Sequence, residues 1–350
     1  MPFLINLQPS GRAFEVQRDE TLLAAAIQQG IGLPYGCKDG ACGSCKSRLL
    51  VGRVIHGAHQ QKALSDAEEA AGLILTCCAT PMSDCVVEAR SVPGAGEFPV
   101  LKMPTRVLSI VRPTPDVALL RLQLPANQRF QYHAGQYVEF ILPGGVRRSY
   151  SMANAPSRLG NPPAIELHLR HLPGGLFTDA VFGTMKEKDI LRIEGPFGSF
   201  FLRNEPKDQA RPMVLLASGT GFAPIKALIE QLQDSGSQRP AVLYWGCRSR
   251  ADLYLHDWAE NAAAEMPSLR YIPVLSAPQP GDDWAGRTGL VHQAVMADLP
   301  DLSGHQVYAC GVPVMVDAAQ RDFIAHCGLP AEQFLADAFT SEADKAIALG

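Results

Sequence analysis

The stretch that decides the fold of the N-terminal part of the chain is Tyr35-Gly36-Cys37-Lys38-Asp39-Gly40-Ala41-Cys42-Gly43-Ser44-Cys45. Its three cysteines have the spacing C-x4-C-x2-C, and further cysteines follow along the chain. Two bridged irons need four thiolates, and this spacing lets a single loop supply three of them. The glycines of the stretch suit a loop whose backbone must pass close to inorganic sulfide. The spacing therefore predicts a [2Fe–2S] cluster held by Cys37, Cys42, Cys45 and one more cysteine.

The fourth ligand must come from the remaining cysteines of residues 37–85, which hold six of the nine in the chain. Zinc is the alternative metal, but zinc ligands typically come as paired C-x2-C knuckles and only one occurs here. Cys77 and Cys78 are adjacent, so spacing alone leaves both open. The string 75–84 resembles the ferredoxin-module pattern L-x-C-x-x-x-P-x-S-D, which implies that Cys77 is the ligand. Cys85 begins an apolar run and is expected in the core.

Length and charge limit the class of protein. The chain has 350 residues, enough for two or three domains, with 47% hydrophobic and 19% charged residues. Its net charge of −4 argues against a nucleic-acid-binding protein held by bulk positive charge. We find no apolar run long enough for a membrane span and no signal-peptide pattern at the start, so we expect a cytoplasmic location. Cysteines in a reducing compartment favour metal or redox chemistry over disulfides.

The flanks of the cysteine loop predict a small domain over residues 1–92. Two β runs at 3–7 and 14–16 are typical of a hairpin, and 22–29 is expected to be a short helix. Residues 65–68 have the sequence of a capping box, which starts a second helix. These features resemble a β-grasp ferredoxin of the plant type.

A linker and an all-β domain are expected next. Residues 93–104 hold three prolines and two glycines without an apolar period, which is typical of a linker. Beyond them, short apolar runs are separated by turn residues, as in an antiparallel barrel or sandwich. The runs lie at 105–111, 117–124, 136–142, 148–152, 164–171 and 189–194. They predict a second domain over residues 105–208.

Three strings of this domain resemble the ferredoxin–NADP⁺ reductase superfamily. The first is Arg148-Ser149-Tyr150-Ser151, which has the flavin-binding pattern R-x-Y-S. The second is 171–178, with two glycines followed by a threonine, and the third is Gly195-Pro196-Phe197-Gly198. Each string by itself could be an ordinary turn, but the three occur in the family's order and spacing. The resemblance implies an antiparallel β-barrel that binds FAD.

The resemblance also implies a role for each residue of these motifs. Arg148 would pair with the FAD pyrophosphate, because a guanidinium binds phosphate through a bidentate fork. Tyr150 would lie against the isoalloxazine ring, and Ser151 would sit near the flavin N5. A helix N-terminus with its free N–H groups would meet the pyrophosphate. The residues implied there are Gly174, Gly175 and Thr178.

From Pro212 onward the pattern changes to alternating strands and helices. An apolar run at 213–217 is typical of a buried parallel strand. Further strands are expected at 241–245, 270–275, 306–309 and 333–336, and helices near 251–264, 289–297 and 314–326. This alternation predicts a doubly wound α/β domain over residues 209–350.

Two motifs of this third domain resemble the nicotinamide-binding motifs of the same superfamily. Residues 219–224 read G-T-G-F-A-P and residues 310–315 read C-G-V-P-V-M. The resemblance implies that the first motif binds NAD(P) and that Cys310 lies beside the nicotinamide. The alternative is that Cys310 is a small buried residue at a strand end. The implied nicotinamide contacts are Gly219, Thr220, Gly221, Pro224, Cys310, Gly311 and Met315, with Ser151 and Cys310 nearest the chemistry.

The choice between NADH and NADPH depends on the turn after the second strand of this domain. Arg248 and Arg250 lie there, and arginines at this place can bind a 2′-phosphate. Related NADH-dependent reductases also have an arginine at this turn, followed by the Asp-Leu-Tyr that residues 252–254 show here. We therefore expect NADH and leave NADPH open. Phe339 is the candidate for an aromatic residue that shields the flavin, although packing of the terminal segment would explain it too.

Taken in order, the three domains resemble the ferredoxin-containing reductase components of bacterial oxygenases. The implied electron path runs from NADH through FAD and the [2Fe–2S] cluster to a partner, and the isolated chain is expected to be monomeric. The partner is expected to be a terminal oxygenase. Two alternatives are a deoxysugar dehydrase, as for CDP-6-deoxy-Δ3,4-glucoseen reductases, and general electron transfer without a dedicated partner. The expected docking edge on the ferredoxin module comprises Lys38, Asp39, Lys46 and Arg48, and His56 and His59 are expected to be surface residues.

Overall fold

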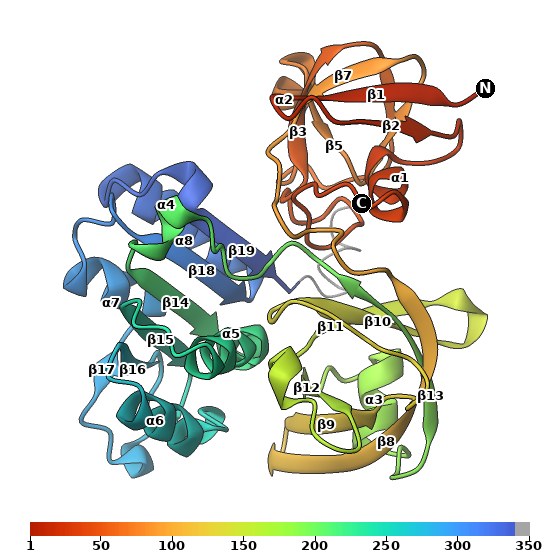
Figure 1. Cartoon of the computed structure of the whole chain (residues 1–350). Helices are drawn as coiled ribbons and strands as arrows, with labels where there is room; N and C mark the ends of the chain where they lie inside the picture. The colour runs from red at the N-terminus through yellow and green to blue at the C-terminus, as the bar shows by residue number, and fades with distance from the viewer. Residues whose placement is uncertain (340–350) are drawn as a thin grey trace. The chain divides into compact units, whose positions relative to one another are not determined.

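The computed structural model of the chain describes residues 1–339. It divides into two compact units, each with its own core. The first comprises residues 1–100 with Ala338 and Phe339, and the second comprises Leu101–Asp337. The second unit contains both the barrel and the α/β domain (Figure 1).

The first unit is a β-grasp fold, as predicted. Its five-stranded sheet has the order β2-β1-β7-β3-β5, with β1 and β7 parallel. The strands are β1 (Phe3–Gln8), β2 (Ala13–Val16), β3 (Lys46–Val51), β5 (Leu73–Leu75) and β7 (Cys85–Glu88), and a separate pair is β4 (Val54–His56) with β6 (Ala79–Pro81). Helix α1 (Leu22–Gln28) begins at Thr21, whose hydroxyl accepts the N–H of Ala24. Helix α2 (Asp66–Ala70) begins with the predicted capping box, in which Ser65 and Glu68 each bind the other's backbone N–H.

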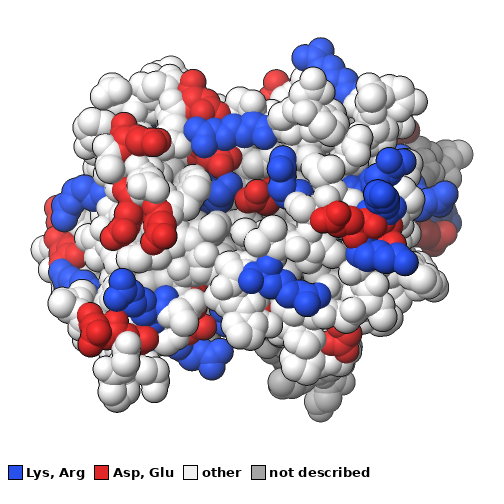
Figure 2. Space-filling view, turned by 90° about the horizontal axis from the view of Figure 1, so that it is seen from below, with Lys and Arg blue, Asp and Glu red and all other residues white. Residues whose placement is uncertain are grey.

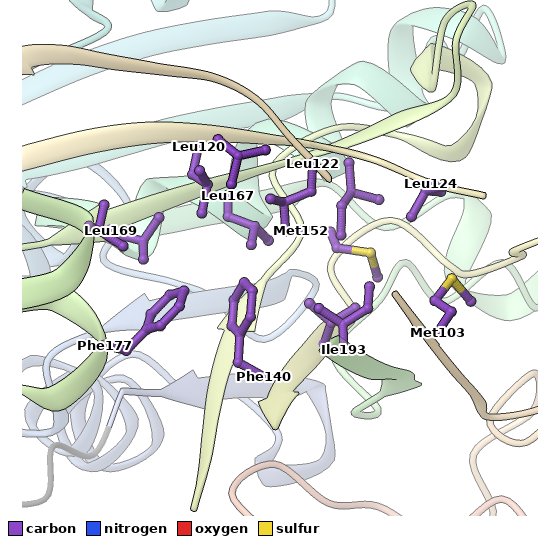
Figure 3. Close-up of a cluster of buried hydrophobic side chains, with 14 of the residues drawn as sticks. Met103, Leu120, Leu122, Leu124, Phe140, Met152, Leu167, Leu169, Phe177 and Ile193 are labelled. Carbon is purple, nitrogen blue, oxygen red and sulfur yellow. The ribbon is translucent and has the colours of Figure 1, made fainter. Parts of the chain in front are cut away.

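The barrel is a six-stranded antiparallel sheet with the order β11-β10-β13-β8-β9-β12. Its strands are β8 (Leu101–Thr114), β9 (Val117–Gln123), β10 (Tyr137–Ile141), β11 (Arg147–Ser151), β12 (Ala164–Arg170) and β13 (Ile190–Phe197). A bridge between Met152 and Leu167 joins the two outer strands. Buried apolar side chains from β8, β9, β10, β12 and β13 fill the interior, together with Met152, which follows β11, and Phe177 from helix α3 (Leu176–Phe182) (Figure 3). Because the bridge between Met152 and Leu167 closes the sheet, the second domain is a barrel rather than a sandwich.

The predicted linker 93–104 is wrong at its C-terminal end, because β8 already begins at Leu101. Buried and exposed residues alternate from there, with Met103 and Thr105 facing inward. Pro104 pairs only with β13, since the register with β9 starts at Arg106. A proline is tolerated in a strand where no second neighbour needs its N–H. The sequence therefore assigns the residues up to Pro104 to the linker, although residues 101–104 belong to β8.

The α/β domain is a parallel sheet with the order β17-β16-β15-β14-β18-β19. Its strands are β14 (Met213–Ser218), β15 (Ala241–Cys247), β16 (Leu269–Leu275), β17 (Arg287–Thr288), β18 (Gln306–Gly311) and β19 (Phe334–Ala338). The helices between them are α5 (Phe222–Asp234), α6 (His256–Glu265), α7 (Val291–Asp298) and α8 (Pro313–His326). The order of the strands reverses at β14: β15, β16 and β17 lie on one side of it, and β18 and β19 lie on the other. Ligands bind at such a switch point.

On the face shown in Figure 2, basic and acidic side chains are interspersed without a large field of one sign. Among the described residues, helices long and apolar enough to span a bilayer are absent.

Candidate functional site

The cysteines of the first unit form two thiol pairs. The backbone N–H of Cys42 donates to Cys37 Sγ at 3.3 Å, and the N–H of Cys37 donates to Cys42 Sγ at 3.4 Å. Cys45 Sγ lies 3.2 Å from Cys77 Sγ. Each iron of a two-iron cluster takes two thiolates, so two close pairs have the composition that the cluster needs. Backbone N–H groups directed at sulfur are also a usual feature of such sites.

Glycines allow the loop to fold around these thiols. Gly40 has a φ of +77°, and a Cβ placed on it would lie 2.8 Å from both Cys78 Sγ and His59 Cβ. Gly43 also has positive φ, at +75°. Residues with side chains rarely adopt this conformation and would collide here. The loop conformation thus depends on glycine at position 40, as the sequence suggested.

Cys77 and Cys78 differ in their surroundings. Cys77 is buried and faces Cys45, whereas Cys78 is half-buried with its sulfur 3.5 Å from that of Cys77. Cys85 lies at the start of β7, buried as expected, with its thiol near Ser83 O at 3.2 Å. The geometry therefore favours Cys77 over Cys78 as the partner of Cys45.

His56 and His59, expected at the surface, are half-buried and face a carboxylate. Glu69 Oε1 lies 3.3 Å from His56 Nδ1 and 3.1 Å from His59 Nε2, and both rings are largely covered. The other ring nitrogen of His59 lies 2.8 Å from Gly57 O. Sequence spacing cannot show this contact, because Glu69 comes from helix α2 on a different segment.

In the barrel, the R-x-Y-S motif forms β11. The Tyr150 ring packs against Phe140 and Phe177, with ring centroids 5.8 and 5.4 Å away. Burial, opposed by Arg148, raises the pKa of Tyr150 to about 12, so the phenol is neutral. Arg148 Nη1 donates to Arg147 O at 2.8 Å, and Arg147 itself pairs with Glu139 at 2.9 Å. The strand thus presents one aromatic ring and one guanidinium within three residues.

The turn before α3 has a defined hydrogen-bond pattern. Thr178 Oγ1 donates to Leu172 O at 3.0 Å, and the N–H of Gly174 donates to Asp179 Oδ2 at 3.0 Å. A Cβ on Gly175 would lie 2.6 Å from Thr178 Oγ1. Gly175 and Thr178 therefore shape the turn, with the threonine hydroxyl directed at the backbone.

The first nicotinamide motif forms a tight turn between β14 and α5. A Cβ on Gly221 would lie 2.2 Å from Cys310 O, and one on Gly311 would lie 2.1 Å from Ser218 Oγ. Gly219 O accepts the indole N–H of Trp245 at 3.0 Å. The two motifs, far apart in sequence, are thus in direct contact at the switch point. Pro224 and Met315 are buried in the first turns of α5 and α8, and Thr220 is half-buried.

Ser151, Cys310 and Asp337 meet inside the second unit. Ser151 Oγ donates to Asp337 Oδ2 at 3.1 Å, and Cys310 Sγ lies 4.0 Å from the same oxygen. All three are buried. Burial, assisted by the Asp337 carboxylate, raises the pKa of Cys310 well above its usual value, so the thiol stays protonated and is not a nucleophile.

Sequence reasoning missed Asp337 and Arg170. The only sequence signal for Asp337 is an acid within the apolar strand β19, just before Phe339. Arg170, at the end of β12, has its guanidinium 3.7 Å from the position of a Gly219 Cβ. Its Nε is buried without a partner among the described residues, and Asp116 lies 3.6 Å from Nη1. Both residues gain their position only through the fold.

The two arginines after β15 differ. The backbone N–H and Nη1 of Arg250 bind Asp282 at 3.2 and 3.3 Å, whereas the Arg248 side chain is exposed.

Phe339, the candidate shield for the flavin, follows β19 and is half-buried.

Three family models match the chain in the order of these sites. They are a 2Fe-2S iron-sulfur cluster binding domain at residues 5–82, an oxidoreductase FAD-binding domain at 104–202 and an oxidoreductase NAD-binding domain at 215–321. With the geometry above, they define an NADH-dependent flavin and iron–sulfur oxidoreductase that binds [2Fe–2S], FAD and NAD(H). The chain belongs to the ferredoxin–NADP⁺ reductase superfamily.

Similar proteins cover nearly the whole chain. The CDP-6-deoxy-L-threo-D-glycero-4-hexulose-3-dehydrase reductase of Yersinia pseudotuberculosis is 42% identical, over 97% of this chain and 99% of its own. Reductase component 2 of the terephthalate 1,2-dioxygenase of Comamonas is 37% identical, over 96% and 97%. Among solved structures, the Amycolatopsis cytochrome P450 reductase GcoB has a TM-score of 0.79 at 34% identity, over 97% and 99%. The expected three-domain fold is thus confirmed.

Proposed function

We propose that this chain takes hydride from NADH and delivers the electrons singly to a separate oxygenase component. The observation that carries the proposal is the presence, on one chain, of a buried Ser151–Asp337–Cys310 site and of two thiol pairs. FAD accepts two electrons together and can release them one at a time, whereas a [2Fe–2S] cluster carries one. A chain with both sites can convert between two-electron and one-electron transfer.

For the cluster, we infer that Cys37 and Cys42 hold one iron and that Cys45 and Cys77 hold the other. The pairing of the thiols supports this assignment, as does the burial of Cys77.

For FAD, we infer that Arg148 binds the pyrophosphate and that Tyr150 packs against the ring system. The covered, neutral phenol of Tyr150 supports a role in contact rather than in proton transfer. Ser151 would lie near the flavin N5, and the turn formed by Gly174, Gly175 and Thr178 would approach the pyrophosphate through its backbone. Phe339 remains the candidate shield for the flavin.

For NADH, we infer that the turn at 219–221 and the first turn of α5 form the floor of the binding site. The close contact of Gly221 with Cys310 supports a shared site in which Cys310, Gly311 and Met315 lie near the nicotinamide. Arg170, whose Nε is buried beside Gly219, would bind a phosphate of the dinucleotide. Exposed Arg248 would contact the adenosine end.

A dehydrase is the second candidate partner. The observation that favours it is the 42% identity with the Yersinia dehydrase reductase over nearly the full length of both chains. The same internal electron path would serve both partners, so the difference must lie in docking. On the proposed docking edge, Lys46 is paired with Glu68 at 2.6 Å, and Arg48 Nη1 donates to Ala71 O at 3.0 Å. Asp39 and Arg48 are exposed to solvent.

The experiment is capture of partners by the tagged, cluster-loaded protein from its own host under anaerobic conditions, followed by mass spectrometry. Enrichment of an oxygenase subunit supports the first candidate, and a pyridoxamine-phosphate-type dehydrase supports the second. Each captured protein is then purified, and its addition must raise the rate of NADH oxidation above that of the reductase alone. If neither class is enriched or stimulates turnover, the dedicated-partner proposal is wrong. Sedimentation of the isolated chain tests the expected monomer.

A further inference from the structure

A buried ammonium group lies between the two domains of the second unit. It belongs to Lys226 of α5, whose side chain is only 7% exposed. Its Nζ lies 2.7 Å from Glu230 Oε1, 3.2 Å from Glu166 Oε1 and 3.1 Å from Ala153 O. Lysine is almost never buried unless it is paired, and three acceptors match the three N–H donors of an ammonium. The site is therefore fully satisfied.

The acceptors of Lys226 come from two different domains. Glu230 lies one helical turn further along α5, whereas Glu166 is in β12 of the barrel. Ala153 follows Ser151, the last residue of β11, by two positions. Glu230 also accepts the N–H of Ala155 through Oε2, at 2.8 Å. Two side chains of α5 thus bind the backbone segment that leaves the R-x-Y-S strand.

Each charged side chain binds the backbone group of opposite partial charge on this segment. The ammonium of Lys226 binds a carbonyl at position 153, and the carboxylate of Glu230 binds an N–H at position 155. An ordinary ion pair between residues i and i+4 would stabilise α5 alone and would need no such partners. Since α5 begins at the nucleotide turn, the pair connects that turn to the end of the flavin strand.

Neighbouring groups hold Glu166 in place. His168, which has no exposed side-chain surface, lies 3.0 Å from Glu166 Oε1 through Nε2 and 2.9 Å from the Tyr254 hydroxyl through Nδ1. Burial lowers the pKa of His168, so a neutral ring donates to Glu166 and accepts from Tyr254. Tyr254 belongs to the α/β domain, so this second chain of hydrogen bonds also crosses between the domains.

We propose that Lys226, acting with Glu230, is a positioning residue for hydride transfer: the pair sets the approach of the nucleotide turn to Ser151. The nicotinamide must come within contact distance of the flavin in one orientation, and a displacement of about 1 Å at such a site can cost about a hundredfold in rate. The conformation of the nucleotide turn, as distinct from its placement against the barrel, does not depend on Lys226, because its close contacts are with Cys310 and Trp245. Loss of the pair should therefore affect the rate of transfer more than the affinity for NADH.

The test is Lys226→Met, which keeps a long apolar side chain and removes the ammonium. With FAD-loaded protein mixed anaerobically with NADH, we expect the limiting rate of flavin bleaching to fall about tenfold to a hundredfold. The NADH concentration for half the limiting rate should change by less than about threefold, and the FAD content should stay unchanged. Lys186→Met, at an exposed lysine of the barrel, is the matched control and should leave the rate unaltered.

A second measurement does not depend on activity. In flavin-free protein, hydrogen exchange of the peptide that contains residues 153–158 should be faster in Lys226→Met than in the wild type. Ala153 O loses its ammonium donor, and Glu230, which accepts the Ala155 N–H, loses the ammonium that orders it. Glu230→Gln keeps the shape and an acceptor oxygen, and we expect a smaller fall in rate, about threefold to tenfold. The Glu230→Gln variant decides the outcome if Lys226→Met does not fold.

A wild-type limiting rate in folded Lys226→Met would overturn the proposal, as would a wild-type rate in Glu230→Gln when Lys226→Met fails to fold. A fall in NADH affinity without a fall in limiting rate would also contradict it. Flavin reduction by NADH precedes transfer to any partner. The test therefore stands apart from the partner assigned under the proposed function.

Discussion

The hydroxyl of Ser151 donates a hydrogen bond to the carboxylate of Asp337, with 3.1 Å between Oγ and Oδ2, although 186 positions separate them in sequence. Ser151 ends a strand of the barrel, and Asp337 lies in β19 of the α/β domain. Cys310 lies 4.0 Å from the same carboxylate oxygen. One buried carboxylate therefore joins the two residues that the sequence had assigned to the chemistry of two separate domains.

Replacement of Asp337 tests this relationship. Asp337→Ala leaves the buried Ser151 hydroxyl without this acceptor, and we expect the limiting rate of flavin reduction by NADH to fall about tenfold or more. Asp337→Asn keeps an acceptor oxygen and should lose less. Rapid-mixing absorbance measures both. Equal rates in Asp337→Ala and the wild type would show that the hydrogen bond does not orient Ser151 for the reaction.

Gly221→Ala should destabilise the second unit. The new Cβ would lie 2.2 Å from Cys310 O, so the nucleotide turn and the 310–311 segment must separate. Such overpacking typically costs about 1–3 kcal/mol. Gly304→Ala is the control, because its Cβ would meet nothing within 4 Å. Urea unfolding followed by tryptophan fluorescence compares the two variants, and an equal loss in both would contradict the close contact.

Arg148→Ala should weaken FAD binding. Loss of a charge-assisted hydrogen bond typically costs about 1.5–3 kcal/mol, which corresponds to about tenfold to a hundredfold in the dissociation constant. Titration of flavin-free protein with FAD measures it. Arg121→Ala, at an exposed arginine of β9, is the control for loss of a positive charge. Unchanged FAD affinity in Arg148→Ala would mean that another residue binds the pyrophosphate.

Cys42→Ser should remove the visible absorbance and the iron of the cluster, because one iron loses a thiolate. NADH should still reduce FAD and two-electron dyes, but cytochrome c reduction should fall at least about tenfold if electrons leave through the cluster. Cys78→Ser is the matched control and should keep the cluster, since Cys77 is the cysteine that faces Cys45. Loss of iron in Cys78→Ser would reverse the assignment of the fourth ligand.

Glu166 should make stability depend on pH in the acid range. Burial opposes its ionisation, but the hydrogen bond from His168 and the charge of Lys226 outweigh burial and lower its pKa from 4.5 to about 2. Because the folded pKa is the lower one, the stabilisation is complete above about pH 4.5 and disappears as the pH falls toward 2. The shift corresponds to at most about 3 kcal/mol.

The comparison of wild type with Glu166→Gln measures this effect. The difference in free energy of unfolding should be largest near pH 7 and should shrink between pH 4.5 and pH 2. Urea unfolding at pH 7, 4.5 and 3.5 gives the trend. A difference that is constant over this range would mean that the charge of Glu166 is not what stabilises the fold.

Much of the fold could be predicted because its signals are local. The cysteine loop, the capping box at Ser65 and the alternation of strands and helices after residue 212 each reflect chemistry within a few residues of sequence. The start of β8 could not be predicted, because whether Pro104 is tolerated depends on which strands lie beside it. Asp337 and Arg170 were missed for the same reason, since a single acid or base in a strand is not distinctive until its neighbours are known.

The sequence by itself determined the kinds of cofactor, because [2Fe–2S], FAD and NAD(H) each require particular residues at short, fixed spacings. Only the tertiary structure decided which groups act together. It set Cys45 against Cys77, Ser151 against Asp337, and the ammonium of Lys226 against a carbonyl of the neighbouring domain. These contacts join segments far apart in the chain, and they form only when burial brings the segments together and excludes the water that would otherwise satisfy their polar groups.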